Sequence, residues 1–545
     1  MRNEDFTNWS KEDLVKEIKK LKNRKKYGIV WEEQKTKEKF DKDVEGKLPI
    51  LKEVKSKEIQ TEKISPTNIL IEGDNFHSLS VLNYTHNNSI DVIFIDPPYN
   101  TGNDDFKYND KFVDKVDVYR HSKWISFMKK RLELAKKLLK QSGVIFITID
   151  DNEFSQLKLL CDKVFHEENF VSTIPWQARK SVSNDTIVSQ SHHYILLYAK
   201  NHKILQKRKI NFRLRANKEK FSNPDNDPRG DWTADPLDGA GIRTNLSYEI
   251  TNPNTGKKIL PTSGRHWVTT EKEYHNLLKD NRIIFGKSGT GKPQRKRFWT
   301  EAEEKGLVIK SWWDDAGTTT NGTLELEQIL GEKKFNNPKP VSLLKKILSF
   351  STSHDSVILD FFAGSGTTGH AVLELNDMDK GSRKFILCTN NENEICTEVC
   401  YPRIKNVIKG YTNLKNEKVK GLGGNLKYFK TDFVDGEPTD KNKKKLVDQC
   451  TEMLCLKEDC FDELKQTKNY SIFKNHGDNY LGIIYDDDGI EPLKNQIKSL
   501  DKKFNVYVFS LDDSAREDEF EDVIDMVDLK PIPEVILNVY RRIFR

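Results

Sequence analysis

Short apolar segments that alternate with helix-period segments constrain this sequence more than any other feature. The first series joins the expected strands 68–74, 91–96, 143–150 and 194–200 through the expected helices 76–84, 119–140 and 151–165. The alternation lapses after residue 200 and returns with a helix at 337–350, a strand and helix at 356–375 and a strand at 384–395. Because this order is typical of a parallel α/β sheet, we predict one core sheet built from two sequence blocks.

The composition of the remaining segments divides the chain further. Residues 201–335 contain Gly, Pro, Asn and Trp without clear periodicity, and the composition changes again after residue 430. We therefore expect an N-terminal helical region (1–60), a first core block (61–200), an inserted domain (201–335), a second core block (336–430) and a small C-terminal α/β domain (431–545).

The bulk composition predicts a soluble, cytoplasmic protein. Of the 545 residues, 32% are charged, and no apolar run approaches the ~20 residues that span a bilayer. The first residues include acids and lack the apolar stretch of a signal peptide. The seven cysteines include no Cys-x-x-Cys pair, which favours reduced structural thiols over a zinc site.

Two motifs follow expected strands. The segment DVIFIDPPYNTG (91–102) leads an apolar strand directly into Asp96-Pro97-Pro98-Tyr99. In VILDFFAGSGTTG (357–369) a strand passes through glycines into a helix, and because glycine has no Cβ the backbone can closely approach a nucleotide-like ligand. This pattern is neither the GxGxxG of NAD sites nor a phosphate-binding loop. Glu392 follows a later strand, placed like the acid that binds ribose hydroxyls.

The inserted segment carries two basic clusters, at 200–220 and 291–299, which are interleaved with aromatic residues. This combination is typical of a nucleic-acid interface, but each cluster alone is typical of solvated surface, and the aromatics could form a small core. The side chains that we expect to contact DNA are Lys207, Arg208, Lys209, Arg213, Arg295 and Arg297. The segment GKSGTGKP (286–293) matches GxxxxGK, but Pro293 replaces the required Ser or Thr, so we interpret it as a basic loop.

The two motifs together resemble the paired signatures of DNA amino-methyltransferases that depend on S-adenosyl-L-methionine. Asp96-Pro97-Pro98-Tyr99 precedes Phe362-Ala363-Gly364-Ser365-Gly366, an order similar to the β group of that family. Wider segments between about residues 60 and 430 resemble the modification (Mod) subunits of type III restriction-modification systems. The resemblance implies a Rossmann-like methyltransferase sheet, with the insert at 201–335 as a target-recognition domain.

The resemblance assigns catalysis to Asp96, Pro97, Pro98 and Tyr99. The exocyclic amine of adenine is a poor nucleophile because its lone pair is delocalised into the ring. Asp96 and the carbonyl oxygen of Pro97 can accept its N–H bonds, and the prolines fix φ at about −65° and hold these acceptors rigidly. Tyr99 offers a ring against which an extruded base can stack. The transfer needs no metal ion.

The resemblance also implies the cofactor contacts. The residues expected at the methionine end are Asp360, Phe362, Gly364, Gly366 and Thr367, with Glu392 at the ribose and Asp74 at the adenine amine. Asn390, Asn391 and Glu394 compete with Glu392, and Asp74 could instead cap a helix. Lys339 begins the helix that is expected to wall the cofactor pocket.

We therefore expect a site-specific DNA adenine-N6 methyltransferase that acts as the modification subunit of a type III-like system. Cytosine-N4 methylation is one alternative, although such enzymes more often carry Ser before Pro-Pro-Tyr. A DNA-recognition subunit for a partner nuclease is the other. The resemblance implies double-stranded DNA as substrate, a homodimer, and a restriction (Res) subunit that the acidic segment 512–528 could dock. That segment could equally be a solvated face.

Overall fold

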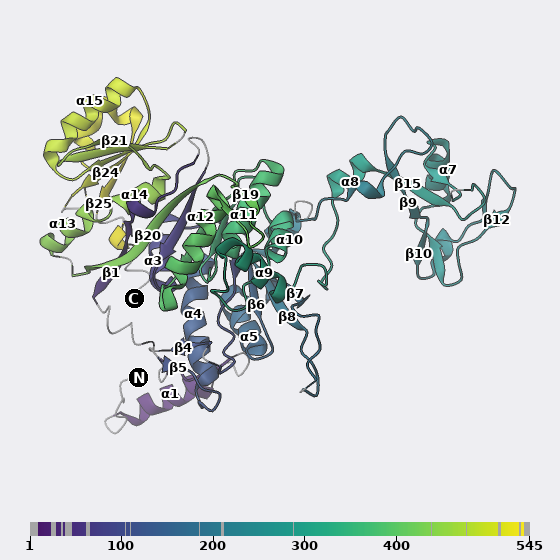
Figure 1. Cartoon of the computed structure of the whole chain (residues 1–545), viewed down its shortest axis with the longest axis horizontal. Helices are drawn as coiled ribbons and strands as arrows, with labels where there is room; N and C mark the ends of the chain where they lie inside the picture. Colours follow the sequence, from purple (N-terminus) through teal and green to yellow (C-terminus); the bar gives the residue numbers. More distant parts are fainter. Residues whose placement is uncertain are drawn as a thin grey trace. The chain divides into compact units, whose positions relative to one another are not determined.

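The computed structural model divides the chain into two compact units (Figure 1). The first unit comprises Met1–Lys207 and Lys310–Arg545, and the second comprises Arg208–Ile309. The residues that the structure describes are 9–22, 29–33, 36, 38, 46–61, 66–103, 105–108, 111–184, 186–208, 212–286, 288–437, 439–475, 477–510, 514–532 and 536–538.

Nine strands within the described residues form the central sheet of the first unit. Their order is β1 (Lys47–Glu53), β20 (Asn425–Asp435), β2 (Thr67–Glu72), β17 (Lys384–Thr389), β16 (Val357–Asp360), β3 (Ile90–Ile95), β6 (Leu139–Ile149), β8 (His192–Ala199) and β7 (Phe170–Gln177). Neighbours are parallel from β20 to β6, whereas β1, β8 and β7 are antiparallel to theirs. Because β2 and β3 of the first block lie beside β20, β17 and β16 of the second, the predicted single α/β sheet is confirmed.

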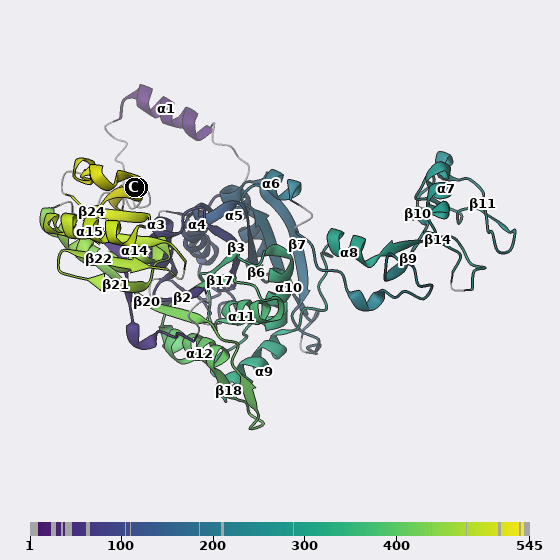
Figure 2. The same ribbon diagram turned by 90° about the horizontal axis from the view of Figure 1, so that it is seen from above.

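Helices cover both faces of this sheet (Figure 2). One face carries α3 (Asn75–Thr85), α4 (Arg120–Leu138) and α5 (Phe154–Phe165), and the other carries α10 (Val341–Ser351), α11 (Thr367–Asp379) and α12 (Tyr401–Lys409). All six residues of β2 are buried, as expected for a strand covered on both faces. Within the ranges that the structure describes, every helix is too short or too polar to span a bilayer.

The connections after β3 and β16 diverge at the centre of the sheet. The chain leaves β3 through α4 toward β6, and it leaves β16 through α11 toward β17 on the opposite side. Such a divergence leaves a crevice at the carboxyl ends of the two strands, where open α/β sheets bind their ligands. Asp96 directly follows β3 and Asp360 ends β16, so both sequence motifs lie at this crevice.

The N-terminal part of the first unit differs from the helical region that we predicted for residues 1–60. Helix α1 (Lys11–Lys22) is present, but β1 pairs with β20 along the edge of the central sheet. Strand β7, at the other edge, also has no clear signal in the sequence. Both edge strands contain a proline, Pro49 or Pro175, and mix polar with apolar residues, so neither shows the periodicity of a buried strand.

The segment after residue 435 forms a second sheet that packs against the first. It contains α13 (Asp440–Asp448), α14 (Thr451–Glu458), β21 (Asp462–Gln466), β22 (Tyr470–Lys474), β23 (Tyr480–Ile484), α15 (Ile490–Leu500), β24 (Phe504–Phe509) and β25 (Val527–Ile532). We predicted a separate domain here, but Met453 and Leu454 of α14 share one apolar core with Leu79 and Leu82 of α3. The segment therefore belongs to the same compact unit as the central sheet.

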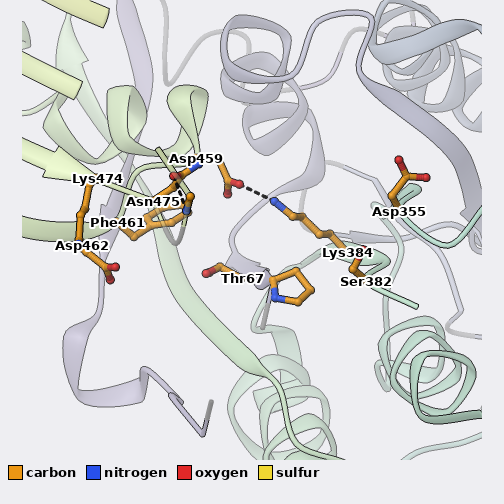
Figure 3. A pocket seen from close by; sticks show the side chains of 11 residues that line it. Thr67, Asp355, Ser382, Lys384, Asp459, Phe461, Asp462, Lys474 and Asn475 are labelled. Carbon is orange, nitrogen blue, oxygen red and sulfur yellow. Dashed lines mark hydrogen bonds and ion pairs between the residues drawn. The ribbon is translucent and has the colours of Figure 1, made fainter. Parts of the chain in front are cut away.

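A cavity of about 240 Å³ lies where this second sheet meets the first (Figure 3). Lys384, at the start of β17, forms an ion pair there with Asp459, and Thr67 at the start of β2 also lines the cavity. The cavity is thus at the amino ends of the parallel strands, opposite the edge that carries Asp96 and Asp360.

The second unit is built around a three-stranded sheet of β14 (Ile283–Ile284), β15 (Gln294–Phe298) and β9 (Trp232–Pro236), with α7 (Glu271–Lys279) and α8 (Trp299–Lys305). Its core contains Leu237, Trp267 and Tyr274. The segment 286–293 connects β14 to β15 in a hairpin, which is not the strand-to-helix turn of a phosphate-binding loop. The unit is shorter than the predicted insert 201–335, because α9 (Thr319–Leu330) packs against α12 of the first unit.

Gly322 allows α9 to pack closely on the segment that precedes α10. A Cβ at position 322 would overlap the carbonyl oxygen of Pro338 and lie 2.9 Å from the carbonyl carbon of Lys339. Alanine normally stabilises a helix by about 1 kcal/mol relative to glycine, but the overlap with rigid backbone reverses the sign. We expect Gly322→Ala to lower the free energy of unfolding by about 2 kcal/mol in chemical denaturation.

The matched control is Leu324→Ala, at a position on the same helix that is 53% exposed. This change should alter the free energy of unfolding by less than about 0.5 kcal/mol. If Gly322→Ala is as stable as the unaltered chain, α9 does not pack as described.

Candidate active site

The Asp96-Pro97-Pro98-Tyr99 segment is held by side chains from neighbouring elements. Trp124 of α4 donates a hydrogen bond from Nε1 to the carbonyl oxygen of Pro98 at 2.7 Å. Thr148 of β6 donates from Oγ1 to Asp96 Oδ1 at 2.5 Å, and the other carboxylate oxygen forms an ion pair with Lys339. The Lys339 side chain is 7% exposed and that of Asp96 is 28% exposed, so the pair sits at the rim of the crevice.

Tyr99 lies between two nitrogen-bearing side chains. Its hydroxyl is 3.4 Å from His193 Nδ1, and the two rings meet edge to face with centroids 5.2 Å apart. Lys339 Nζ lies 5.2 Å from the centre of the Tyr99 ring. Burial, followed by the charge of Lys339, lowers the pKa of His193 to about 4, while burial raises the pKa of Tyr99 well above its usual value. Both groups are therefore neutral near pH 7.

The residue after the motif is fixed by a buried carboxyl group. Asn100 adopts a φ of +57° and donates from Nδ2 to Glu153 Oε1 at 2.5 Å. His121 Nδ1 lies 2.7 Å from the same oxygen. Burial raises the pKa of Glu153 above its usual range. This network sets the direction in which the chain leaves the motif.

The glycine-rich loop after β16 closes the other side of the crevice. Asp360 accepts hydrogen bonds from the amide of Phe362 at 3.0 Å and from Thr368 Oγ1 at 2.5 Å. Gly364 and Gly366 adopt φ values of +49° and +76°, which explains why glycines occupy these positions. Gly366 caps the start of α11.

A cavity of about 450 Å³ lies between the two motifs. Its size is in the range of small-molecule sites. Of the predicted site residues, it is lined by Asp74, Asp96, Pro98, Phe362, Gly364 and Glu392. A Cβ at Gly364 would lie 3.2 Å from the Phe335 ring, which also lines the cavity. The loop thus forms a cradle that a larger residue would fill.

Four residues that we predicted as cofactor contacts, including Asp360, have other partners and lie outside the lining of this cavity. Lys339 directs its ammonium group to Asp96. Thr367 donates its hydroxyl to the carbonyl oxygen of Lys339 at 3.1 Å and accepts from Arg403 at 2.7 Å. A Cβ at Gly366 would lie 3.0 Å from the sulfur of Cys400. These residues support the loop from behind.

The two acids that we predicted as cofactor contacts and that line the cavity are both paired with cations. Asp74 caps α3 through the amide of Phe76 at 2.7 Å, and it lies 3.3 Å from Arg131. The helix-cap alternative is therefore realised, although Asp74 also lines the cavity. Glu392 forms an ion pair with Lys107.

Several site residues lack a sequence signal of their own. Arg131 is 1% exposed and reaches Asp74, Asn75 and Glu38 from within an ordinary amphipathic helix. His193 begins an apolar strand and gives no motif. Thr148 is the exception, because it is a polar residue inside the apolar run of β6, next to the strand that carries Asp96.

The cations that we predicted for DNA contact occupy different environments. Lys207 and Arg208 are exposed, and Lys209 lies outside the described residues. Arg213 and Arg295 are half-buried, and Arg297 lies 3.0 Å from Asp235 across the second unit's own sheet. The aromatics of this unit pack internally, with Phe298 buried and Phe221 against Trp299.

Comparison with known sequences places the chain in a class. A family of DNA methylases matches residues 90–399, which is more than half of the chain. The chain therefore belongs to the DNA methylase family, and the predicted resemblance is confirmed.

Two of the similar sequences are Mod subunits of type III restriction-modification enzymes. The Mod subunit of the type III restriction-modification enzyme StyLTI of Salmonella typhimurium is 39% identical over 356 residues, covering 59% of this chain and 52% of that protein. The EcoPI Mod subunit of Escherichia phage P1 is 32% identical over 403 residues, covering 63% of this chain and 60% of that protein. The type II methyltransferase M.KpnI of Klebsiella pneumoniae is 29% identical over 399 residues, covering 66% of this chain and 90% of that protein. The chain thus spans only about half to three fifths of the two Mod subunits.

The buried carboxyl group of Asp360 generates a pH-dependent prediction. Burial raises its pKa from 3.8 to about 7. Between about pH 4 and 7 the unfolded chain ionises this group and the folded chain does not, so its contribution to stability is lost as the pH rises through that window. Asp360→Asn removes the titration. We therefore expect the free energy of unfolding of the variant, relative to that of the unaltered chain, to rise by about 1 kcal/mol for each unit of pH between about 4 and 7.

Chemical denaturation of both proteins at pH 5, 6, 7 and 8 measures this difference. The comparison cancels the other titrating groups, which the two proteins share. A difference that stays constant with pH would show that Asp360 is ionised throughout.

Proposed function

We propose that this chain transfers a methyl group from S-adenosyl-L-methionine to the N6 amine of an adenine in DNA. The observation that carries the proposal is that the Asp96 carboxylate and the glycine-rich cradle of Gly364 line one cavity. An acceptor for amine protons thus lies beside a loop shaped for close approach of a ligand. Membership of the DNA methylase family supports the same reaction.

The residues of the cavity fit the proposed cofactor. Gly364 leaves room for the ligand at the end of β16, and Phe362 offers an aromatic surface. Asp74 and Glu392 supply carboxylates that suit an adenine amine and ribose hydroxyls. Asp360 fixes the loop through the Phe362 amide. When bound, the cofactor supplies a methyl group made electrophilic by a sulfonium sulfur.

Asp96 is the proposed acceptor for the target amine. A carboxylate has about four lone-pair sites, and Thr148 and Lys339 occupy one on each oxygen. The remaining sites can accept an N–H bond of the base and turn the nitrogen lone pair toward the methyl group. Because Asp96 is already fixed by two partners, it needs little rearrangement when the substrate binds. Pro97 and Pro98 would hold the backbone, and Tyr99 would stack on the base.

Adenine is the favoured base because the motif begins with Asp. Cytosine-N4 transfer remains the alternative, since the same acceptor geometry suits either exocyclic amine. Similarity to two Mod subunits supports a role as the modification subunit of a type III-like system.

Substrate recognition and assembly complete the proposal. The second unit, together with exposed Lys207 and Arg208, would contact DNA phosphates and base edges. Arg295, Arg297 and Arg213 are weaker candidates because each is half-buried. The chain would act in the cytoplasm as a homodimer with a restriction (Res) subunit. The alternative is a chain that recognises DNA without transferring methyl groups, and sequencing of DNA from cells that express the chain distinguishes the two.

Long-read sequencing of DNA from cells that express this chain alone tests the reaction. We expect N6-methyladenine at one recurring sequence, and its absence in cells that express Asp96→Ala. The variant should keep its affinity for S-adenosylmethionine in calorimetry, because Asp96 acts on the base. If methylated cytosine is found instead, cytosine is the target base. If neither strain shows a modified base, this chain does not transfer methyl groups without a partner.

Lys339→Met tests whether this lysine serves Asp96 or the cofactor. Removing the cation frees the carboxylate to turn, so we expect kcat to fall by about tenfold or more while the Kd for S-adenosylmethionine changes by less than about twofold. Lys345→Met is the matched control, because Lys345 lies on α10, the helix that follows Lys339, and pairs with Glu374 at 2.7 Å. A large loss of cofactor affinity in Lys339→Met would restore our original assignment of this residue to the cofactor.

A further inference from the structure

The loop between β7 and β8 begins and ends close to Tyr99. His193, near the start of β8, contacts the Tyr99 ring, and Trp176, near the end of β7, packs on His193 with ring centroids 5.8 Å apart. Gln177 pairs with His192 across the root of the loop. The root is therefore fixed beside the ring that is placed to stack on the target base.

Hydrogen bonds close this loop into a defined hairpin. The amides of Ala178 and Arg179 donate to the carbonyl oxygen of Ser191 at 2.9 and 3.0 Å. Above them the amide of Ser183 donates to Ser189 Oγ at 2.9 Å. The loop extends beyond the ends of the two strands (Figure 1). Its tip is thus carried on a constrained stem at the same edge of the sheet as Asp96.

The tip presents branched aliphatic side chains to solvent. Val182, Ile187 and Val188 are 75%, 104% and 77% exposed. Exposed Arg179 and Lys180 stand at the base of the same loop. Single exposed aliphatics are common on protein surfaces, but three within one short loop form a local apolar group of the kind that marks an interaction site.

DNA is the partner that fits both kinds of side chain. Cations contact the phosphate backbone, and aliphatic side chains of DNA-binding proteins insert between base steps and unstack them. An enzyme that acts on an exocyclic amine must take the target base out of the stack.

We propose that Ile187, flanked by Val182 and Val188, inserts into the base stack where the target base has left it. Arg179 and Lys180 hold the adjoining phosphates and set the depth of insertion. The inference rests on the proposed function, since it concerns how a base in duplex DNA reaches Asp96. The loop would keep the duplex open while the methyl group is transferred.

Two duplexes that differ only at the partner of the target base test the proposal. Both carry the sequence that the methylated genomic DNA reveals, with the target adenine paired to thymine in one and opposite an abasic site in the other. An adenine without a base-pairing partner leaves the stack at lower cost, so its extrusion depends less on the insertion of Ile187. Transfer of a labelled methyl group is measured for the unaltered chain, Ile187→Ser and Ile187→Leu.

We expect Ile187→Ser to lower kcat/KM by about tenfold or more on the paired duplex and by less than about threefold on the abasic one. Ile187→Leu should retain activity on both. Met378→Ser is the control, because Met378 is 67% exposed at the end of α11 and away from the edge that carries Asp96. Unchanged affinity of each variant for S-adenosylmethionine confirms that the fold is intact.

Other outcomes overturn the proposal in different ways. Equal losses on the two duplexes would mean that the loop binds DNA without opening it. No loss on either would mean that the aliphatic tip serves another partner, such as a protein. Failure of the unaltered chain to methylate either duplex would overturn the proposed function, and the wedge with it.

Discussion

The ion pair between Asp96 and Lys339 is the contact on which the arrangement of the site depends. The two residues are 243 positions apart and come from the two sequence blocks of the central sheet. The carbonyl oxygen of Lys339 also accepts a hydrogen bond from the Thr367 hydroxyl. Lys339 therefore connects the motif after β3 to the loop after β16. A nearly buried ammonium group is costly without a partner, and this cost keeps the two blocks in register at the crevice.

The proposed transfer depends on positioning rather than on proton transfer by these side chains. Thr148 and Lys339 fix one carboxylate oxygen each, and Trp124 fixes the carbonyl oxygen of Pro98. His193 is neutral near pH 7 because burial lowers its pKa to about 4, so it adds no charge beside the base. The groups proposed to meet the substrate are therefore held in place before it arrives, which is the efficient way to stabilise charge that develops during transfer.

The sequence predicted those features that are local and strongly patterned. The parallel strands, the two motifs and their meeting at one edge follow from apolar runs and glycine positions. The edge strands β1 and β7 were missed because each contains a proline and mixes polar with apolar residues. The packing of α14 on α3, the partner of Lys339 and the role of Arg131 depend on contacts between distant segments, and no local pattern encodes them.

Part of the backbone strain in this chain lies at the same edge of the sheet as the cavity. Asn100, Asn393 and Glu394 adopt positive φ without being glycine, and Gly364 and Gly366 do so with it. Each non-glycine residue of this kind costs about 1 kcal/mol or more, and the buried Asp360 adds a further cost when it ionises. The large shared core of the two sheets in the first unit supplies the stability that offsets these costs. Packing the C-terminal segment onto α3 therefore stabilises the fold that carries this edge of the sheet.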